Sequence, residues 1–212
     1  MLGQVEVALR KPRSHKDYET ALQSVHKQGL HLTRIVEMLL RLARPDSESE
    51  PLRLEEIDLY AWINSQAEHW SNHPRGADLQ VENSEFPVRV VTHALLLGQL
   101  FDNLLDNAWN YSQTGTAVTV RVGRESGQTF FEITDRGMGM SPDELCHLFE
   151  PFFRSNGARQ LGIPGAGLAL SVVQRIAQAL DLTVSVKSEI KAGSTFSVTF
   201  PQSFGDGNSK GS

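Results

Sequence analysis

Amide side chains recur on one face of a helical stretch near the middle of the chain, residues 100–112 (LFDNLLDNAWNYS). At 3.6 residues per turn an apolar stripe forms one side, and it consists of Leu100, Phe101, Leu104, Leu105 and Ala108. The opposite side carries Asn103, Asp106, Asn107 and Asn110. Asparagine is a middling helix former, because its side chain competes with the backbone for hydrogen bonds. The amides therefore indicate a functional role for polar side chains, and their oxygens suit a hard cation such as Mg²⁺.

Two glycine-rich stretches add a second kind of chemistry. The first, DRGMG at residues 135–139, follows a strand pattern directly, and the second, GIPGAGLAL at residues 162–170, opens into a helix pattern. The second lacks both the preceding strand of a dinucleotide-binding fingerprint and the Gly-Lys-Ser/Thr ending of a phosphate loop. What remains is a helix N-terminus with exposed N–H groups at Gly165, Ala166 and Gly167, which suits a polyphosphate.

The elements that must position these residues follow from hydrophobic periodicity and turn residues. Strands are expected near residues 52–57, 79–83 and 88–91, in a hairpin of residues 116–124 and 129–135, and in a hairpin of residues 183–188 and 194–200 with Gly193 at its turn. Helices are expected at residues 59–72, from a cap at Thr92 through the amide-bearing stretch, and at residues 168–180. This order predicts an α+β fold, a mixed β-sheet with helices gathered on one face.

The first 51 residues have a different pattern. A heptad seam predicts a long helix over about residues 15–44, and it consists of Tyr18, Leu22, Val25, Gly29, Leu32, Val36, Leu39 and Ala43. A short apolar pattern at Leu2, Val5 and Leu9 precedes it, so residues 1–44 are expected to form an α-helical hairpin with a truncated first arm. We interpret residues 45–51 as a linker, residues 52–201 as the main domain and residues 202–212 as a disordered tail.

Five motifs, taken in order, resemble those of the sensor histidine kinases of two-component signalling. The matching segments are an N box at residues 103–108, a first glycine box at 135–139, an F box at 149–154, a second glycine box at 165–168 and a third at 193–196. This family lies within the wider GHKL group, which includes gyrase-type and chaperone ATPases. The resemblance implies the Bergerat fold, an ATP-binding α/β sandwich, and implies that residues 1–44 are part of a dimerisation and phosphoacceptor hairpin.

The resemblance also implies roles for the site residues. Asn107 would ligate Mg²⁺ directly, and Asn103, one turn earlier, would support the ion or its waters without adding negative charge near the phosphates. Asp135 would accept a hydrogen bond from the adenine amine and select ATP over GTP, the alternative being a turn-capping aspartate. Gly137 and Gly139 would let the backbone approach the purine. The other implied nucleotide-binding residues are Tyr111, Arg154, Gly165, Ala166, Gly167, Leu168 and Thr195.

Asn103, Asn107 and Arg154 are the expected catalytic residues. Arg154 would reach the phosphates when a mobile lid, residues 151–164, closes, and a solvated arginine is the alternative. Tyr111 could cover the adenine ring or be an ordinary core aromatic. Related ATPases place a glutamate, the general base for water, where Asn103 stands. An amide cannot take a proton, which favours phosphoryl transfer to a protein group over hydrolysis.

The sequence departs from the family pattern at three places. Asn110 stands where the family usually has Lys, Arg or His, which predicts modest nucleotide affinity, and Pro164 predicts a stiff hinge for the lid. The phosphoacceptor motif, a histidine followed by an acid with a proline five positions after the histidine, matches none of the seven histidines. We therefore expect a fragment that begins after this motif, the alternative being a degenerate protein.

Composition limits the class of protein further. A formal net charge of -5 does not indicate the positive charge that is typical of nucleic-acid-binding proteins. No apolar run approaches the roughly 18 residues of a membrane span. The single cysteine, Cys146, excludes an internal disulfide and fits a reducing compartment. We expect a cytoplasmic part, without membrane contact of its own, of a protein anchored in the bacterial inner membrane.

The leading functional hypothesis is the catalytic portion of a sensor histidine kinase. With ATP and Mg²⁺ it would transfer the γ-phosphoryl group to a histidine outside this chain, for relay to an aspartate in the receiver domain of a response regulator. The full-length protein is expected to be a homodimer through the helical hairpin, and this chain is expected not to phosphorylate itself. The alternatives are a non-catalytic nucleotide-binding regulatory module and, disfavoured by Asn103, a gyrase-like ATPase.

Overall fold

The computed structural model describes residue 18 and residues 52–82, 87–163 and 165–202. The chain divides into two compact units, Met1–Pro51 and Leu52–Ser212. The predicted hairpin of residues 1–44, apart from Tyr18, and the predicted linker lie outside the described residues, as do residues 203–212 of the tail. These expectations stay predictions.

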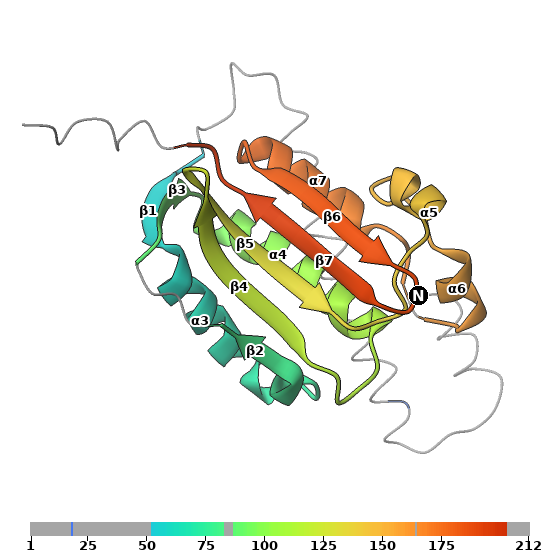
Figure 1. Ribbon diagram of the computed structural model, residues 1–212. Coiled ribbons are helices and arrows are strands. Elements are labelled where there is room, and N and C mark those ends of the chain that lie inside the picture. Colours follow the sequence, from blue (N-terminus) through green and yellow to red (C-terminus); the bar gives the residue numbers. More distant parts are fainter. Residues whose placement is uncertain (1–17, 19–51, 83–86, 164, 203–212) are drawn as a thin grey trace, which may run out of the picture. The chain divides into compact units, whose positions relative to one another are not determined.

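A five-stranded mixed sheet forms one layer of the second unit, as Figure 1 shows. Its strands, in spatial order, are β2 (Leu79–Val81), β4 (Val118–Glu125), β5 (Gln128–Asp135), β7 (Gly193–Thr199) and β6 (Thr183–Glu189). Strand β2 runs parallel to β4, and the other neighbouring pairs are antiparallel. The two predicted hairpins are present as β4–β5 and β6–β7, and the predicted mixed sheet is confirmed.

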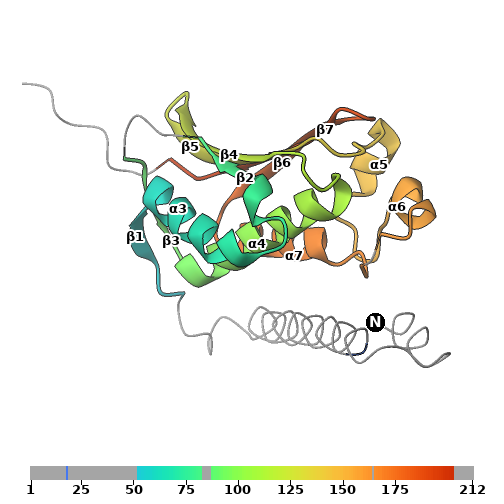
Figure 2. The ribbon, with the colours of Figure 1, turned by 90° about the horizontal axis from the view of Figure 1, so that it is seen from below.

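Three helices lie on one face of this sheet: α3 (Leu59–His69), α4 (Ala94–Tyr111) and α7 (Ala169–Ala179), which Figure 2 shows on the same side. The predicted apolar stripe of α4 is buried, and the ring of Phe101 lies 6.0 Å from that of Phe131 on β5. Burial alternates along β5, so Phe131 and Ile133 face the helices while Thr134 faces the other way. The α+β architecture with helices on one face is confirmed.

Strands β1 (Glu55–Asp58) and β3 (Arg89–Thr92) form a separate two-stranded antiparallel sheet. The main-chain amide of Leu59 donates to the carbonyl of Val88 at 2.7 Å, which ties the start of α3 to the segment before β3. Both strands were expected from the sequence, but strand periodicity does not identify a strand's partner. Among the described helices none is long and apolar enough to cross a membrane.

The predicted capping role of Thr92 is wrong. His93 is the N-cap of α4, and its Nδ1 accepts a hydrogen bond from the amide of Leu96 at 3.3 Å. Thr92 is the last residue of β3, where it is buried and pairs with Glu55. Because this pairing keeps Thr92 in extended backbone, the helix begins one residue later than expected.

Two short helices, α5 (Pro142–His147) and α6 (Asn156–Gln160), are additional to those predicted from the sequence. Helix α5 begins with a capping box, in which the Ser141 hydroxyl accepts from the Glu144 amide at 3.3 Å. The Glu144 carboxylate accepts from the Ser141 amide at 3.0 Å. The Ser-x-x-Glu spacing was therefore a readable signal for this helix.

Candidate functional site

The carboxylate of Asp135 is buried at the end of β5, on the side of the sheet that faces the helices. Its Oδ1 accepts a hydrogen bond from the amide of Gly137 at 2.7 Å. Burial raises the pKa of Asp135 to about 6, and hydrogen bonds from the main-chain amides of Gly137 and Ser194 oppose that rise. A buried carboxylate held by amides of its own loop can also accept a hydrogen bond from a ligand.

The two predicted metal-binding amides lie one turn apart on α4. Asn103 is buried, and its amide nitrogen donates to the carbonyl of Gln99 at 2.7 Å, which leaves the amide oxygen as the available ligand atom. Asn107 is half-buried, and its side chain makes no hydrogen bond within the described part of the chain. Two adjacent amide oxygens fit a hard cation that keeps several water ligands.

Backbone hydrogen bonds bring the predicted motifs together. The end of α4 meets the first glycine box where the amide of Met138 donates to the carbonyl of Tyr111 at 3.1 Å. The same box meets the turn before β7 where the amide of Lys191 donates to the carbonyl of Met138 at 2.7 Å. The F box meets the second glycine box through the Phe152 amide and the Gly167 carbonyl, at 2.8 Å.

Neighbouring backbone lies so close to the glycines of the first box that it leaves no room for a side chain. A Cβ atom added at Gly137 would overlap the carbonyl of Tyr111, and one at Gly139 would overlap the carbonyl of Glu189. Gly139 also has a φ of +65°, a conformation that side chains disfavour. The structure thus gives a second reason for both glycines, and their contact with a purine stays a prediction.

Arg154 lies close to Tyr111, which connects the F box to the end of α4. Burial raises the pKa of the Tyr111 phenol, and the positive charge of Arg154 acts against this rise. The Arg154 guanidinium also donates to the carbonyl of Ile163, at the far end of the predicted lid. Both residues are half-buried, so neither is a fully solvated surface side chain.

The second glycine box leads into α7 as predicted. Gly165 and Ala166 are exposed, and Leu168 is the N-cap of α7 without a side-chain hydrogen bond to the helix amides. The first amides of this 11-residue helix therefore receive no side-chain cap. This is the kind of helix terminus that favours a negatively charged group.

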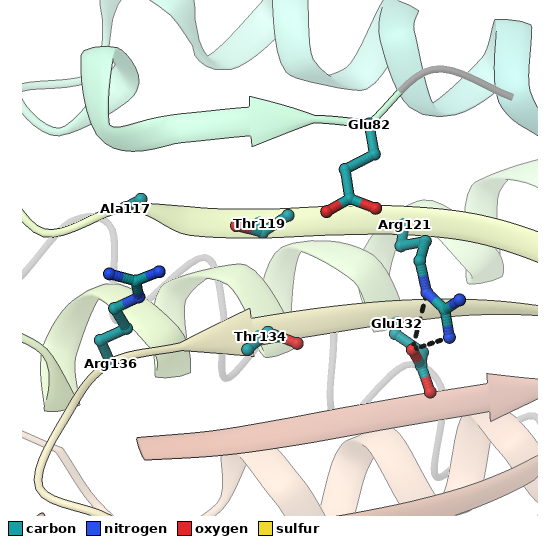
Figure 3. A pocket seen from close by; sticks show the side chains of 7 residues that line it. All are labelled: Glu82, Ala117, Thr119, Arg121, Glu132, Thr134 and Arg136. Atoms are coloured by element: carbon teal, nitrogen blue, oxygen red, sulfur yellow. Dashed lines mark hydrogen bonds and ion pairs between the residues drawn. The ribbon is translucent and has the colours of Figure 1, made fainter. Parts of the chain in front are cut away.

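Thr195 faces away from Asp135. Its hydroxyl hydrogen bonds to that of Thr134 at 3.0 Å, on the open face of the sheet. Thr134 also lines a hollow, which Figure 3 shows with Glu82, Ala117, Thr119, Arg121, Glu132 and Arg136. None of the predicted site residues lines this hollow.

Ser194, which is not among the residues predicted from the sequence, lies beside Asp135. It is buried, lies opposite Asp135 in the β5–β7 pair, and contributes its main-chain amide to the carboxylate. The Ser194 and Ser188 hydroxyls lie 2.9 Å apart. The signal that could have found Ser194 is the two-residue alternation along β7, which puts Ser194 and Thr195 on opposite faces.

Comparison with known proteins identifies the family. Residues 92–203 match the model of the histidine kinase-, DNA gyrase B- and HSP90-like ATPases. The chain belongs to this family. The match covers α4 and all five motifs, so residues 92–203 form a domain of this ATPase family, which supports binding of ATP.

Similar proteins include sensor proteins and sensor histidine kinases. Sensor protein IrlS of Burkholderia pseudomallei is 29% identical over 95% of this chain and 43% of its own length. Sensor protein QseC of Salmonella typhi is 33% identical over 90% of this chain and 41% of its own length. The chain therefore spans less than half of these relatives, and it corresponds to a histidine kinase catalytic domain.

Solved structures agree with this assignment. The mycobacterial sensor histidine kinase MprB is 28% identical, with a TM-score of 0.59 over 70% of this chain and 97% of that chain. The Acinetobacter baumannii histidine kinase AdeS, at 23% identity, shares the fold with a TM-score of 0.66 over 95% of this chain and 91% of that chain.

The buried charge of Asp135 predicts a measurable effect on stability in the absence of nucleotide. The raised pKa means that the ionised carboxylate destabilises the fold, so this group favours folding below pH 4 and loses that contribution as the pH rises through 6. Asp135→Asn should raise the free energy of unfolding at pH 8 by roughly 1–3 kcal/mol and by little at pH 3.5. Urea unfolding at both pH values measures the difference.

Glu132 provides a matched control on the same strand. Burial raises the pKa of Glu132, but hydrogen bonds from Ser197 and Arg121 outweigh burial and lower it overall. Glu132→Gln should therefore lower the stability at pH 8. An Asp135→Asn variant that is less stable than the parent at pH 8 would contradict the destabilising charge.

Proposed function

We propose that this chain transfers the γ-phosphoryl group of Mg²⁺-bound ATP to a histidine of a dimerisation hairpin. The observation that carries the proposal is that backbone hydrogen bonds join the first glycine box both to the end of α4 and to the turn before β7, beside the buried carboxylate of Asp135. From that histidine the phosphoryl group passes to an aspartate in a response-regulator receiver domain. A relative named as a sensor histidine kinase supports the step to histidine.

The adenine end of ATP is assigned to Asp135. Its carboxylate accepts a hydrogen bond from the exocyclic amine of adenine, and it would repel the carbonyl that guanine presents at the same place. The main-chain amides of Gly137 and Ser194 hold the carboxylate on the helix side of the sheet. Ser194 replaces Thr195 as the β7 residue closest to this contact.

The phosphate end is assigned to α4, the F box and the start of α7. Asn107 and Asn103 would hold Mg²⁺ through their amide oxygens, and the chemistry a bound ion supplies is neutralisation of charge on the phosphates. Arg154 and the first amides of α7 supply positive charge and hydrogen-bond donors to the same phosphates. These groups would position the phosphates and stabilise their negative charge, which is the main requirement of phosphoryl transfer.

Asn103 favours transfer to a protein over hydrolysis. Its amide nitrogen already donates to the carbonyl of Gln99, so the side chain is fixed and has no group that can take a proton from water. The transfer therefore depends on an incoming histidine that is itself the nucleophile. In the full-length protein we expect dimerisation through the helical hairpin to bring that histidine to the site, and we expect a membrane anchor outside this chain.

Replacing Asn107 tests the metal assignment. Asn107→Ala removes a ligand oxygen but leaves a good helix former on a half-buried position, so folding should survive while Mg²⁺-dependent ATP binding falls about tenfold or more. Titration calorimetry with and without Mg²⁺ measures this. Asn110→Ala, on the exposed side of the same helix, is the control and should bind within about twofold of the parent. Equal Mg-ATP affinity of Asn107→Ala and the parent would refute the assignment.

Replacing Asp135 tests the adenine assignment. Asp135→Asn loses the charge and can present a donor to the adenine amine, so affinity for ATP should fall by about 1–3 kcal/mol. ADP should weaken by the same factor, because the base is common to both nucleotides. A variant that loses affinity for ATP but keeps it for ADP would place Asp135 near the γ-phosphate instead.

A labelling experiment tests the transfer itself. Incubated with γ-labelled ATP and Mg²⁺, the chain should remain unlabelled, because none of its seven histidines has the phosphoacceptor context. An added hairpin that carries a phosphoacceptor histidine should gain an acid-labile, base-stable label, and Asn107→Ala should lower its rate. Without any label on the hairpin, the chain would be a regulatory nucleotide-binding module. Stoichiometric labelling of the chain alone would place the acceptor among its own histidines.

A further inference from the structure

A segment outside the five motifs holds the helix that carries the amides. We name residues 70–78 the clamp segment; it contains two short 3₁₀ turns, Trp70–Asn72 and Gly76–Asp78. The indole nitrogen of Trp70 donates to the Asp102 carboxylate on α4 at 2.9 Å. The ring of His73 stacks on that of Trp109, with 4.3 Å between centroids and 9° between planes. The clamp segment thus lies along the last three turns of α4.

The centre of the clamp segment is a buried arginine, Arg75. Its Nε donates to Asp78 at 2.7 Å, and its Nη1 donates to the carbonyl of Trp109 and, at 2.9 Å, to that of Ser112. Its Nη2 donates to the carbonyl of Gln113 at 2.8 Å. The planar guanidinium therefore uses all three of its nitrogens, and most of its bonds go to main-chain oxygens where α4 ends.

Helix α4 needs such a partner because its own sequence does not complete its end. The last turn has no basic residue, and its C-cap Ser112 is in extended backbone. The final carbonyls of a helix have no partner within the helix and carry partial negative charge. Ser112 Oγ satisfies the carbonyl of Ala108 at 2.7 Å, and Arg75 satisfies that of Trp109.

One of the two carbonyls between those held by Arg75 accepts a hydrogen bond from the first glycine box. Tyr111 lies between Trp109 and Ser112, and its carbonyl accepts from the amide of Met138 at 3.1 Å. The same carbonyl occupies the space where a side chain at Gly137 would project. A shift of the helix end would therefore move the loop whose Gly137 amide holds the Asp135 carboxylate.

We infer that Arg75 is a positioning residue for nucleotide binding: it fixes the end of α4, and through the Tyr111 carbonyl it fixes the first glycine box. The inference rests on the proposed ATP site, which Arg75 itself does not touch. Lysine cannot replace it, because one ammonium group cannot reach Asp78 and the carbonyls of Trp109, Ser112 and Gln113 together. The charge alone is thus insufficient, and the planar fork is required.

The test compares Arg75→Lys with the parent and with Val122→Ala. The control variant removes apolar volume from a buried position of β4, so it lowers stability without changing the clamp segment. All proteins are studied well below the onset of unfolding. The first readout is hydrogen exchange of the Met138 amide without nucleotide, measured by NMR, and the second is the Kd for Mg-ATP by calorimetry.

The expected result is selective. Arg75→Lys should speed exchange at Met138 and weaken Mg-ATP binding, each about tenfold, while Val122→Ala should change neither by more than about twofold. Unchanged exchange at Met138 or unchanged Mg-ATP affinity in Arg75→Lys would overturn the inference. Equal loss of affinity in Val122→Ala would also overturn it, because general destabilisation would then explain the effect.

A second variant keeps the test decisive if Arg75→Lys does not fold. Asp78→Asn retains Arg75 but removes the charge that orients its Nε, so the same two readouts should change in the same direction by a smaller factor. No change in either readout would overturn the inference. If the parent does not bind Mg-ATP, the proposed function fails, and exchange at Met138 still decides whether Arg75 holds the loop.

Discussion

The close approach of two backbones, at the Tyr111 carbonyl and the Met138 amide, is the constraint on which the site depends. The two atoms lie 3.1 Å apart, and any side chain at Gly137 would collide with the carbonyl. One partner is α4, whose Asn103 and Asn107 side chains are proposed to hold Mg²⁺, and the other is the loop after Asp135. Main-chain contact therefore fixes the spacing between the two parts of the protein that are proposed to hold the two ends of ATP.

A second constraint is the buried carboxylate of Asp135. Burial disfavours its charge, and two main-chain amides only partly offset this effect. Its neighbours are fixed by strand pairing with β7 and by the glycine turn, so the carboxylate cannot relax toward water. If stability alone determined the residue at this position, we would expect a neutral one. The charged residue therefore points to a function in binding.

Much of this site could be predicted because its signals are local. The helical spacing of Asn103 and Asn107, and glycines directly after a strand, need no knowledge of tertiary contacts. The errors concern contacts between distant segments. The predicted cap at Thr92 is wrong because its pairing with Glu55 is invisible in sequence, and Ser194 is not found from sequence because the face of β7 depends on its register with β5. Arg75 was missed for the same reason, since its partners lie more than thirty residues away.

The β5–β7 pairing also sets the order in which the site can be assembled during synthesis. Asp135 ends β5, but the strand that supplies Ser194 and completes its surroundings is the last one of the domain. Hairpin β4–β5 can form while the chain is still being made, because its two strands are adjacent in sequence. The surroundings of Asp135, proposed to bind adenine, must wait until β7 has left the ribosome and joined the edge of β5. If the proposed adenine assignment holds, a nascent chain acquires its full set of nucleotide contacts only at the end of translation of this domain, so nucleotide would stabilise the finished domain without guiding its earlier folding steps.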